Sequence, residues 1–98
     1  MKKNNKENRL LPPANLCANK GDLEGEVNLQ WDAVKNANCY VIQKTNRKSK
    51  NAWSHIDIVG EARYTVNGLL PDSKYFFRVA AMNGNCQGEW SEEIEKKI

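Results

Sequence analysis

The stretch Tyr75-Phe76-Phe77-Arg78-Val79-Ala80-Ala81-Met82 decides the fold. Successive side chains of a β-strand point to opposite faces, and this stretch places apolar residues at every second position. The residues that share this face are Tyr75, Phe77, Val79 and Ala81. Turn-forming residues stand at both ends, with 71–73 before the stretch and Asn83-Gly84 after it. We therefore expect residues 75–82 to form a central strand with one buried face.

Six further segments have the alternation, or the β-branched and aromatic content, of short strands. They are residues 15–18, 27–31, 39–45, 53–59, 63–66 and 90–94. The alternation of 53–59 slips once, as at a β-bulge. Helix is an alternative only for 90–97, where Glu and Lys predominate. Seven short strands separated by turn signals predict an all-β protein, an antiparallel sandwich of two sheets.

The length of the chain limits the number of domains, and the distribution of charge limits the classes of partner. A chain of 98 residues is the size of one domain. Residues 1–11 carry four basic side chains and one acidic, which leaves 11 of each sign over 12–98. We expect a disordered basic leader over 1–11 and a folded domain over 12–98. Because the folded part has no excess of positive charge, binding to nucleic acid is disfavoured. No run approaches the ~20 apolar residues of a membrane span, so we expect no membrane insertion.

Candidate catalytic and metal-ligating residues are sparse. His55 is the only histidine, and no glycine-rich nucleophile turn surrounds any serine. The spacings of Cys17, Cys39 and Cys86 match no pattern of paired zinc ligands. The sequence therefore predicts a protein that is not an enzyme and that binds no cofactor and no metal.

Joint order and spacing of several short motifs indicate a family. They are Pro13-Ala14-Asn15-Leu16, Val27-x-Leu29-x-Trp31-Asp32, Ala37-x-x-Tyr40-x-Ile42, Tyr64-Thr65-Val66-x-Gly68-Leu69-x-Pro71-x-x-x-Tyr75-x-Phe77-Arg78-Val79-Ala80-Ala81-x-Asn83, and Gly88-x-Trp90-Ser91. Over residues 12–97 the chain resembles a fibronectin type III domain. This resemblance implies a seven-stranded immunoglobulin-like β-sandwich, in which sheet A-B-E faces sheet C′-C-F-G.

The resemblance also implies structural roles for individual core residues. Trp31 becomes the central inward aromatic of strand B, and it covers Tyr40, Leu69, Phe77 and Val79 of the core. Tyr75 takes the place of the tyrosine corner, with its hydroxyl returning to the backbone of the E–F turn. Trp90 is expected to pack over strand F and to stack on Arg78.

The cysteines leave two alternatives open. In the resembled fold the start of strand C and the F–G loop lie at the same end, and we expect them on neighbouring strands. A disulfide between Cys39 and Cys86 is then one alternative, and two free thiols are the other. Cys17, expected on the outward face of strand A, would stay single in either case.

We expect this module to serve as a structural spacer or as a protein-interaction domain. Recognition would use residues 35–38 and 83–88 at one end of the sandwich, with Lys35, Asn36, Asn38, Asn83, Asn85 and Gln87 as candidate contacts. The partner would be another protein or a neighbouring domain. The sequence contains no Arg-Gly-Asp, so integrin binding is not supported.

A carbohydrate-binding or enzyme-accessory module of a larger polysaccharide-active protein is the alternative function. Trp53 with Tyr64 or Trp90 could form a platform for sugar stacking, which is disfavoured because these residues are assigned to different strands and sheets. The compartment stays open, because residues 1–11 lack the apolar segment of a secretory signal, whereas the resemblance favours an extracellular or cell-surface setting.

Overall fold

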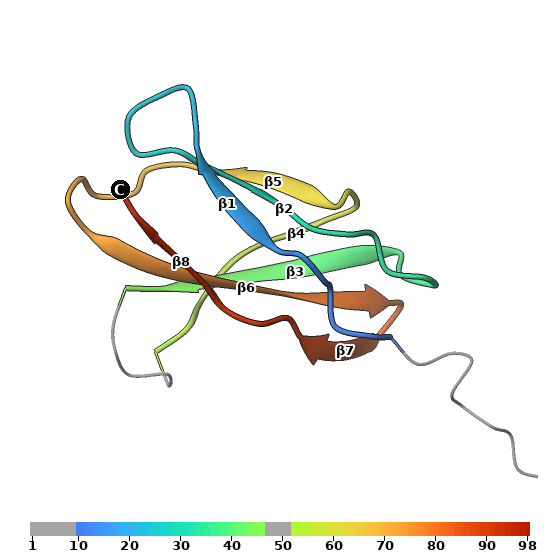
Figure 1. Cartoon of the computed structure of the whole chain (residues 1–98). Helices are drawn as coiled ribbons and strands as arrows, with labels where there is room; N and C mark the ends of the chain where they lie inside the picture. Colours follow the sequence, from blue (N-terminus) through green and yellow to red (C-terminus); the bar gives the residue numbers. More distant parts are fainter. Residues whose placement is uncertain (1–9, 47–51) are drawn as a thin grey trace, which may run out of the picture.

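The computed structural model describes residues 10–46 and 52–98, and these form two antiparallel β-sheets packed face to face (Figure 1). The strands are β1 (Cys17–Lys20), β2 (Val27–Gln30), β3 (Cys39–Thr45), β4 (Ser54–Val59), β5 (Arg63–Val66), β6 (Lys74–Asn83), β7 (Cys86–Trp90) and β8 (Ile94–Lys97). The described residues contain no helix, so the helical alternative for 90–97 was wrong. None of the described segments is a helix that could span a membrane.

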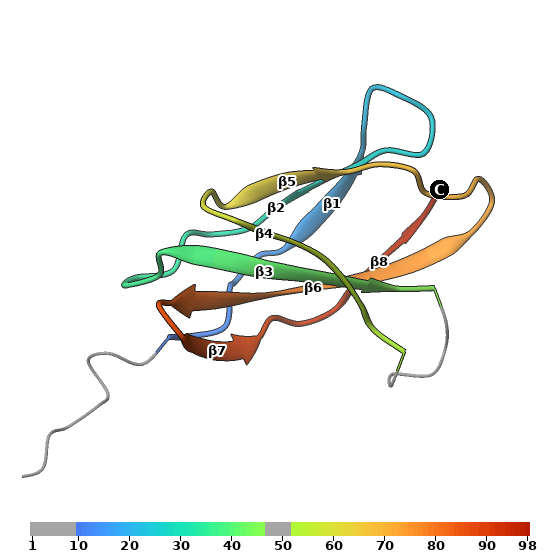
Figure 2. The same cartoon turned by 180° about the vertical axis from the view of Figure 1, so that it is seen from behind.

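The strand order is that of the expected sandwich. One sheet has the order β1-β2-β5, and the other has β4-β3-β6-β7 with β8 also paired to β6 (Figure 2). β3 lies along one side of β6, and β7 and β8 share its other side. The prediction of an all-β immunoglobulin-like sandwich is confirmed, with eight strands in the described chain in place of seven.

β6 is the central strand, as its alternation predicts. Phe77, Val79 and Ala81 are 0% exposed and Tyr75 is 5% exposed, so this face of the strand is buried in the core. Inward residues of both sheets meet above it, among them Val27, Leu29, Trp31, Tyr40, Ile42, Val66 and Leu69. Leu10, which we placed in the leader, is 6% exposed and packs in the same cluster. Residues 1–9 of that leader lie outside the described residues.

The closing strand was wrongly placed at 90–94. Residues 91–93 belong to no strand, so this segment is divided between the end of β7 and the start of β8. At this break Ser91 bonds to β6 through its backbone N–H and its side-chain hydroxyl, in place of a regular backbone pair. Its N–H donates to the Val79 carbonyl at 2.8 Å, and its Oγ accepts the Val79 N–H at 3.0 Å. A buried hydroxyl thus satisfies a backbone donor of β6 at the point where the strand divides.

The first strand differs slightly from its expected bounds, whereas the expected slip in 53–59 is confirmed. The first strand covers 17–20, two residues later than expected, and Asn15 just before it has a φ of 60°. The slip in the alternation of 53–59 corresponds to a register shift in the β3–β4 ladder between Ile42 and Gln43. Since Ile42 faces Asp57 and Gln43 faces His55, Ile56 is the extra residue of a β-bulge.

Candidate functional site

The two predicted recognition segments meet at one end of the sandwich. The Asn83 side-chain amide donates to the Asn36 carbonyl, and the Asn38 N–H donates to the Met82 carbonyl at 2.8 Å. Asn36 has a φ of 72°, in the left-handed region that asparagine tolerates better than most residues. The 35–38 segment is therefore fixed against the end of β6 by hydrogen bonds, even though 47 residues separate its Asn36 from Asn83.

The expected loop 83–88 is largely a hairpin. β6 ends at Asn83 and β7 begins at Cys86, so only Gly84 and Asn85 form the turn. Gly84 has a φ of 62°, which suits a tight two-residue hairpin. Our interpretation of Gln87 as a loop residue was wrong, because Gln87 lies in β7 opposite Met82.

A cleft of about 640 Å³ lies beside this hairpin. It is lined by Leu10, Asn36, Asn83, Cys86, Gln87, Gly88 and Glu89. Of the six predicted contact residues, Asn36, Asn83 and Gln87 line the cleft, whereas Lys35, Asn38 and Asn85 lie outside its lining. Gly88 is required in the wall, since a Cβ there would come within 2.6 Å of the Leu10 carbonyl oxygen. The sequence alone did not indicate the part of Leu10 in this site.

The Arg78 side chain lies between the indole rings of Trp53 and Trp90 on the outward face of the larger sheet. Its guanidinium carbon is 4.0 Å from the Trp90 ring centre and 4.3 Å from the Trp53 ring centre. Its Nε and Nη2 donate to Gln43 Oε1 at 3.0 and 2.7 Å. Desolvation lowers the pKa of Arg78, and the charge of Glu93 opposes that shift.

This arrangement changes the interpretation of the tryptophans. The stack of Trp90 on Arg78 is the contact that we expected, whereas the part of Trp53 in it was missed. Trp53 precedes β4 and Trp90 ends β7, so both belong to the same sheet rather than to different ones. The two rings hold a cation between them, and Tyr64 lies in β5 of the other sheet, where its hydroxyl donates to Asp57. These contacts give the proposed sugar platform no support.

The cysteines are free in the structure: Cys17 and Cys39 are half-buried and Cys86 is exposed. Our expectation that residues 39 and 86 lie on neighbouring strands was wrong. β6 lies between β3 and β7, and its Met82 pairs with Cys39 while its Asn83 pairs with Cys86. Two strand spacings separate the Cα atoms by ~10 Å, beyond the ~7 Å that a disulfide spans.

The inner residues stand in the positions that the resemblance implies. Trp31 is 5% exposed and meets Tyr40 edge to face, with 5.4 Å between ring centres. Its indole N–H has no hydrogen-bond partner among the described residues. The Tyr75 hydroxyl accepts the Leu70 N–H at 3.0 Å, which ties β6 to the turn that precedes it. These residues build the scaffold that holds the cleft.

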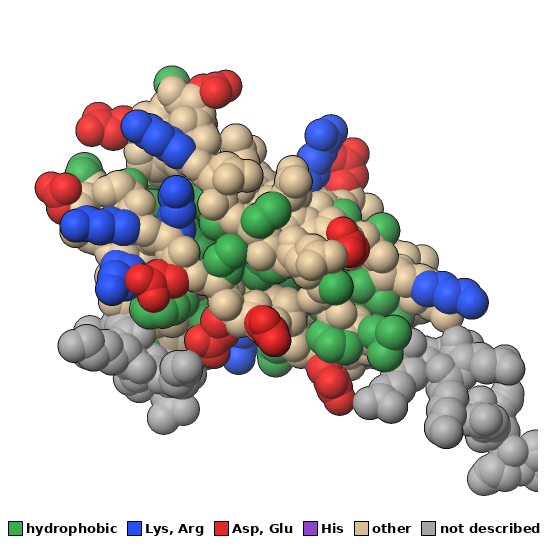
Figure 3. Space-filling view, viewed as in Figure 1, with side chains coloured by type: hydrophobic (Ala, Val, Ile, Leu, Met, Phe, Trp, Pro, Cys, Tyr) green, Lys and Arg blue, Asp and Glu red, His purple; other side chains and the backbone are tan. Residues whose placement is uncertain are grey.

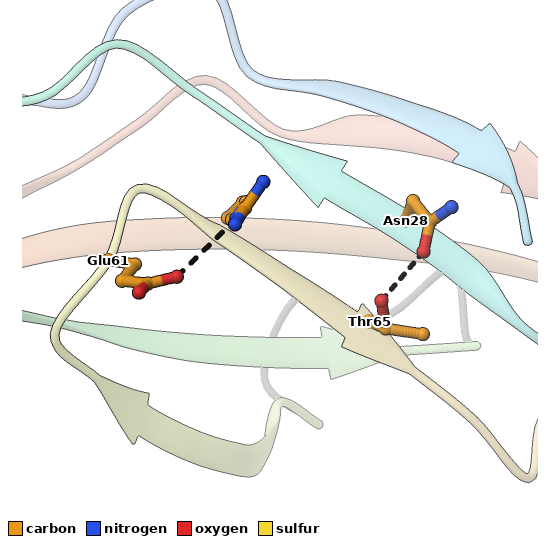
Figure 4. Close-up of polar contacts among 4 residues, drawn as sticks. Asn28, Glu61 and Thr65 are labelled. Carbon is orange, nitrogen blue, oxygen red and sulfur yellow. Dashed lines mark hydrogen bonds and ion pairs between the residues drawn. The ribbon is translucent and has the colours of Figure 1, made fainter.

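The outer face of the smaller sheet is polar. Thr65 Oγ1 bonds to Asn28 Oδ1 at 2.7 Å across the β2–β5 pair, and Arg63 forms a 3.4 Å ion pair with Glu61 (Figure 4). Figure 3 shows basic and acidic side chains interspersed on the face that it presents. No group of three His, Cys, Asp or Glu side chains within residues 10–46 and 52–98 could hold a metal ion.

The layers and the strand order define an immunoglobulin-like β-sandwich. A family model described as "Fibronectin type III domain" matches residues 11–97. The chain therefore belongs to the fibronectin type III family, whose domains commonly act as non-catalytic structural or interaction modules within larger proteins.

Relatives and solved structures agree with this family. The chain is 33% identical over 88 residues to receptor-type tyrosine-protein phosphatase F of Danio rerio, and 31% identical to that of Homo sapiens. These matches cover 88% of the chain but only 5% of each relative. A structure of titin domains A168–A170 superposes with a TM-score of 0.77 at 25% identity, covering 91% of this chain and 32% of that one. An Fn3-like protein from Clostridium thermocellum superposes with a TM-score of 0.76 at 24% identity, covering 85% and 86% of the two chains.

Proposed function

We propose that this domain is a non-catalytic protein-interaction module that binds a partner protein through the cleft beside the β6–β7 hairpin. The observation that carries the proposal is the meeting of Asn36 and Asn83, which brings two distant segments to the wall of one cleft of about 640 Å³. Hydrogen bonds fix both segments, so little conformational entropy is lost when a partner binds.

The lining of the cleft favours a peptide segment as its occupant. Asn36, Asn83 and Gln87 supply side-chain amides, which donate and accept hydrogen bonds as a peptide backbone does. Leu10 adds an apolar surface beside them. Among the described residues that line the cleft, Glu89 alone carries a charge, so an uncharged extended segment fits better than a strongly charged one.

A matched pair of substitutions tests this function. Gln87→Lys places a long charged side chain at the cleft, and Gln30→Lys makes the same change on the exposed face of β2, outside that lining. Proteins captured from an extract of the source organism by the wild-type domain would be identified, purified and titrated against all three domains.

We expect the Gln87→Lys domain to lose at least tenfold in affinity, and the Gln30→Lys domain to bind as the wild type does. Equal binding by all three domains would place the contact elsewhere. Failure of the wild-type domain to bind any protein directly would leave the spacer function ahead.

A further inference from the structure

β4 is an exposed edge of the larger sheet. It pairs with β3 on one side, and no described strand lies on its other side. Edge strands usually carry Pro or Lys, which hinder pairing with other chains, and β4 carries neither. Ile58 on this strand is 49% exposed. An edge of this kind is a template for a second β-strand unless something blocks it.

Asp57 occupies both of its carboxylate oxygens at this edge. Its Oδ1 accepts the N–H of Ile58 at 2.8 Å, and its Oδ2 accepts the hydroxyl of Tyr64 at 3.0 Å. Since the Ile58 N–H goes to a side chain, the β3–β4 ladder does not use it. The same carboxylate joins the edge of the larger sheet to β5, the edge strand of the smaller sheet.

A β-bulge divides the edge into two parts. Ile56 is the extra residue of the β-bulge, and it packs toward the core. The bulge twists the strand away from a regular ladder on the N-terminal side of Asp57. Ser54–His55 and Asp57–Val59 pair with β3 on either side of the bulge, and in the second of these segments the carboxylate covers the Ile58 N–H.

We propose that the Asp57 side chain prevents β4 from pairing with the β4 strand of a second copy of this chain, by covering the Ile58 N–H. An antiparallel β4–β4 pair would be symmetric, with the same surface on both copies, and would bury Ile58 of each copy. It would also break the hydrogen bond between each Asp57 carboxylate and the Ile58 N–H. This inference is independent of the proposed binding cleft, to which none of these residues contributes.

The direct test is to measure the mass of the domain in solution, which shows whether two copies associate. Analytical ultracentrifugation over a wide range of concentrations would compare the wild-type domain with Asp57→Ala, Asp57→Asn, Tyr64→Phe and Glu61→Ala. We expect Asp57→Ala to associate to twice the monomer mass. Asp57→Asn keeps an oxygen for the Ile58 N–H, Tyr64→Phe keeps the carboxylate, and Glu61→Ala removes an equal charge nearby. We expect all three, and the wild type, to stay monomeric.

Several outcomes would overturn the proposal. A folded Asp57→Ala domain that stays monomeric would show that the edge needs no block. Association of Asp57→Asn or Glu61→Ala to the same extent would assign the effect to charge rather than to the covered donor. A wild-type dimer formed through β4 would contradict the proposal outright.

A measurement on the unaltered chain guards against misfolding of the variant. Hydrogen exchange followed by NMR would compare the Ile58 amide of the wild-type domain with the amide of Asn85, which lies in an exposed turn. We expect the Ile58 amide to exchange at least tenfold more slowly. Equal exchange rates would mean that the carboxylate does not cover the donor, and the proposal would fail.

Discussion

Arg78 stacks on Trp90, with 4.0 Å between the guanidinium carbon and the centre of the indole ring. Trp53 covers the other side at 4.3 Å, and Gln43 accepts two of the guanidinium N–H groups. Lysine has neither a planar group to stack nor two fixed donors in a fork, so Arg78→Lys removes both features while keeping the charge. We expect a loss of about 1–2 kcal/mol in the free energy of unfolding, measured in urea. An unchanged midpoint would show that the stack contributes nothing to stability.

The unpartnered indole N–H of Trp31 predicts an asymmetry between two substitutions. Trp31→Phe breaks no hydrogen bond and keeps an aromatic ring against Tyr40, so we expect it to cost about 1–2 kcal/mol. Trp31→Ala empties the middle of the core and should cost about 3–5 kcal/mol. Thermal and urea unfolding of the two variants would measure this difference. A cost for Trp31→Phe well above this range would indicate that the indole nitrogen has a partner in solution.

Tyr75→Phe isolates the hydrogen bond between the Tyr75 hydroxyl and the Leu70 N–H. The ring stays buried beside Phe77, with 6.4 Å between ring centres, so only the hydroxyl is lost. We expect about 1 kcal/mol of destabilisation, the usual cost of one such bond. The Leu70 amide should also exchange faster with solvent, whereas the Ser91 amide, bonded to Val79, should be unaffected. Faster exchange at both amides would mean that the substitution loosens the whole domain.

Alkaline pH should weaken the fold through Tyr64. Desolvation raises the pKa of Tyr64 above its ordinary value near 10, and the hydrogen bond to Asp57 and its charge raise it further. The unfolded chain then loses this proton at a lower pH than the folded chain does. The contribution is therefore complete below about pH 10 and is lost as the pH rises through the folded-state pKa.

Urea unfolding from about pH 8 to about pH 11 would measure this loss. The wild-type domain should lose more stability over that range than Tyr64→Phe, which has no proton to lose at this position. Parallel profiles for the two proteins would contradict the assignment to Tyr64.

The three cysteines should behave as thiols under non-reducing conditions. The exposed Cys86 should react with a thiol reagent faster than the half-buried Cys17 and Cys39. Because no bond joins Cys39 to Cys86 in the structure, a reductant should leave the unfolding temperature unchanged. A native mass two hydrogens lower than that of the reduced chain would show that an intramolecular disulfide forms after all.

The sequence predicted best those features that depend on alternation. β6 has four inward apolar residues between two turns, and no other arrangement buries all of them. The division of the last strand could not be foreseen in this way. It depends on Ser91, whose hydroxyl takes the place of a backbone acceptor, and a hydroxyl in a sequence does not reveal which N–H it will meet.

Contacts between distant segments were partly predictable. The pairing of Arg78 with Trp90 followed from the family resemblance, but Trp53 lies 25 positions before Arg78, and its approach depends on the β3–β4 ladder. The meeting of residues 35–38 and 83–88 at one end of the sandwich was predicted, whereas the cleft beside them was not. Leu10 reaches it because the chain before β1 runs over Gly88, a packing that no local pattern encodes.

The split of the last strand also bears on how the domain would respond to tension. Ile98 and Leu10 lie toward opposite ends of the sandwich, so a pull between them runs along the strands (Figure 1). The pairs from Lys74↔Lys97 to Phe77↔Ile94 would be sheared first, while Ser91 keeps β7 clamped to Val79. Residues 94–97 are already extended along the pull, so releasing them would pass the load to the clamp at Ser91 with little change in the length of the tether. The divided strand thus offers two separate attachments to β6 that fail one after the other, whereas an unbroken strand would form one continuous ladder.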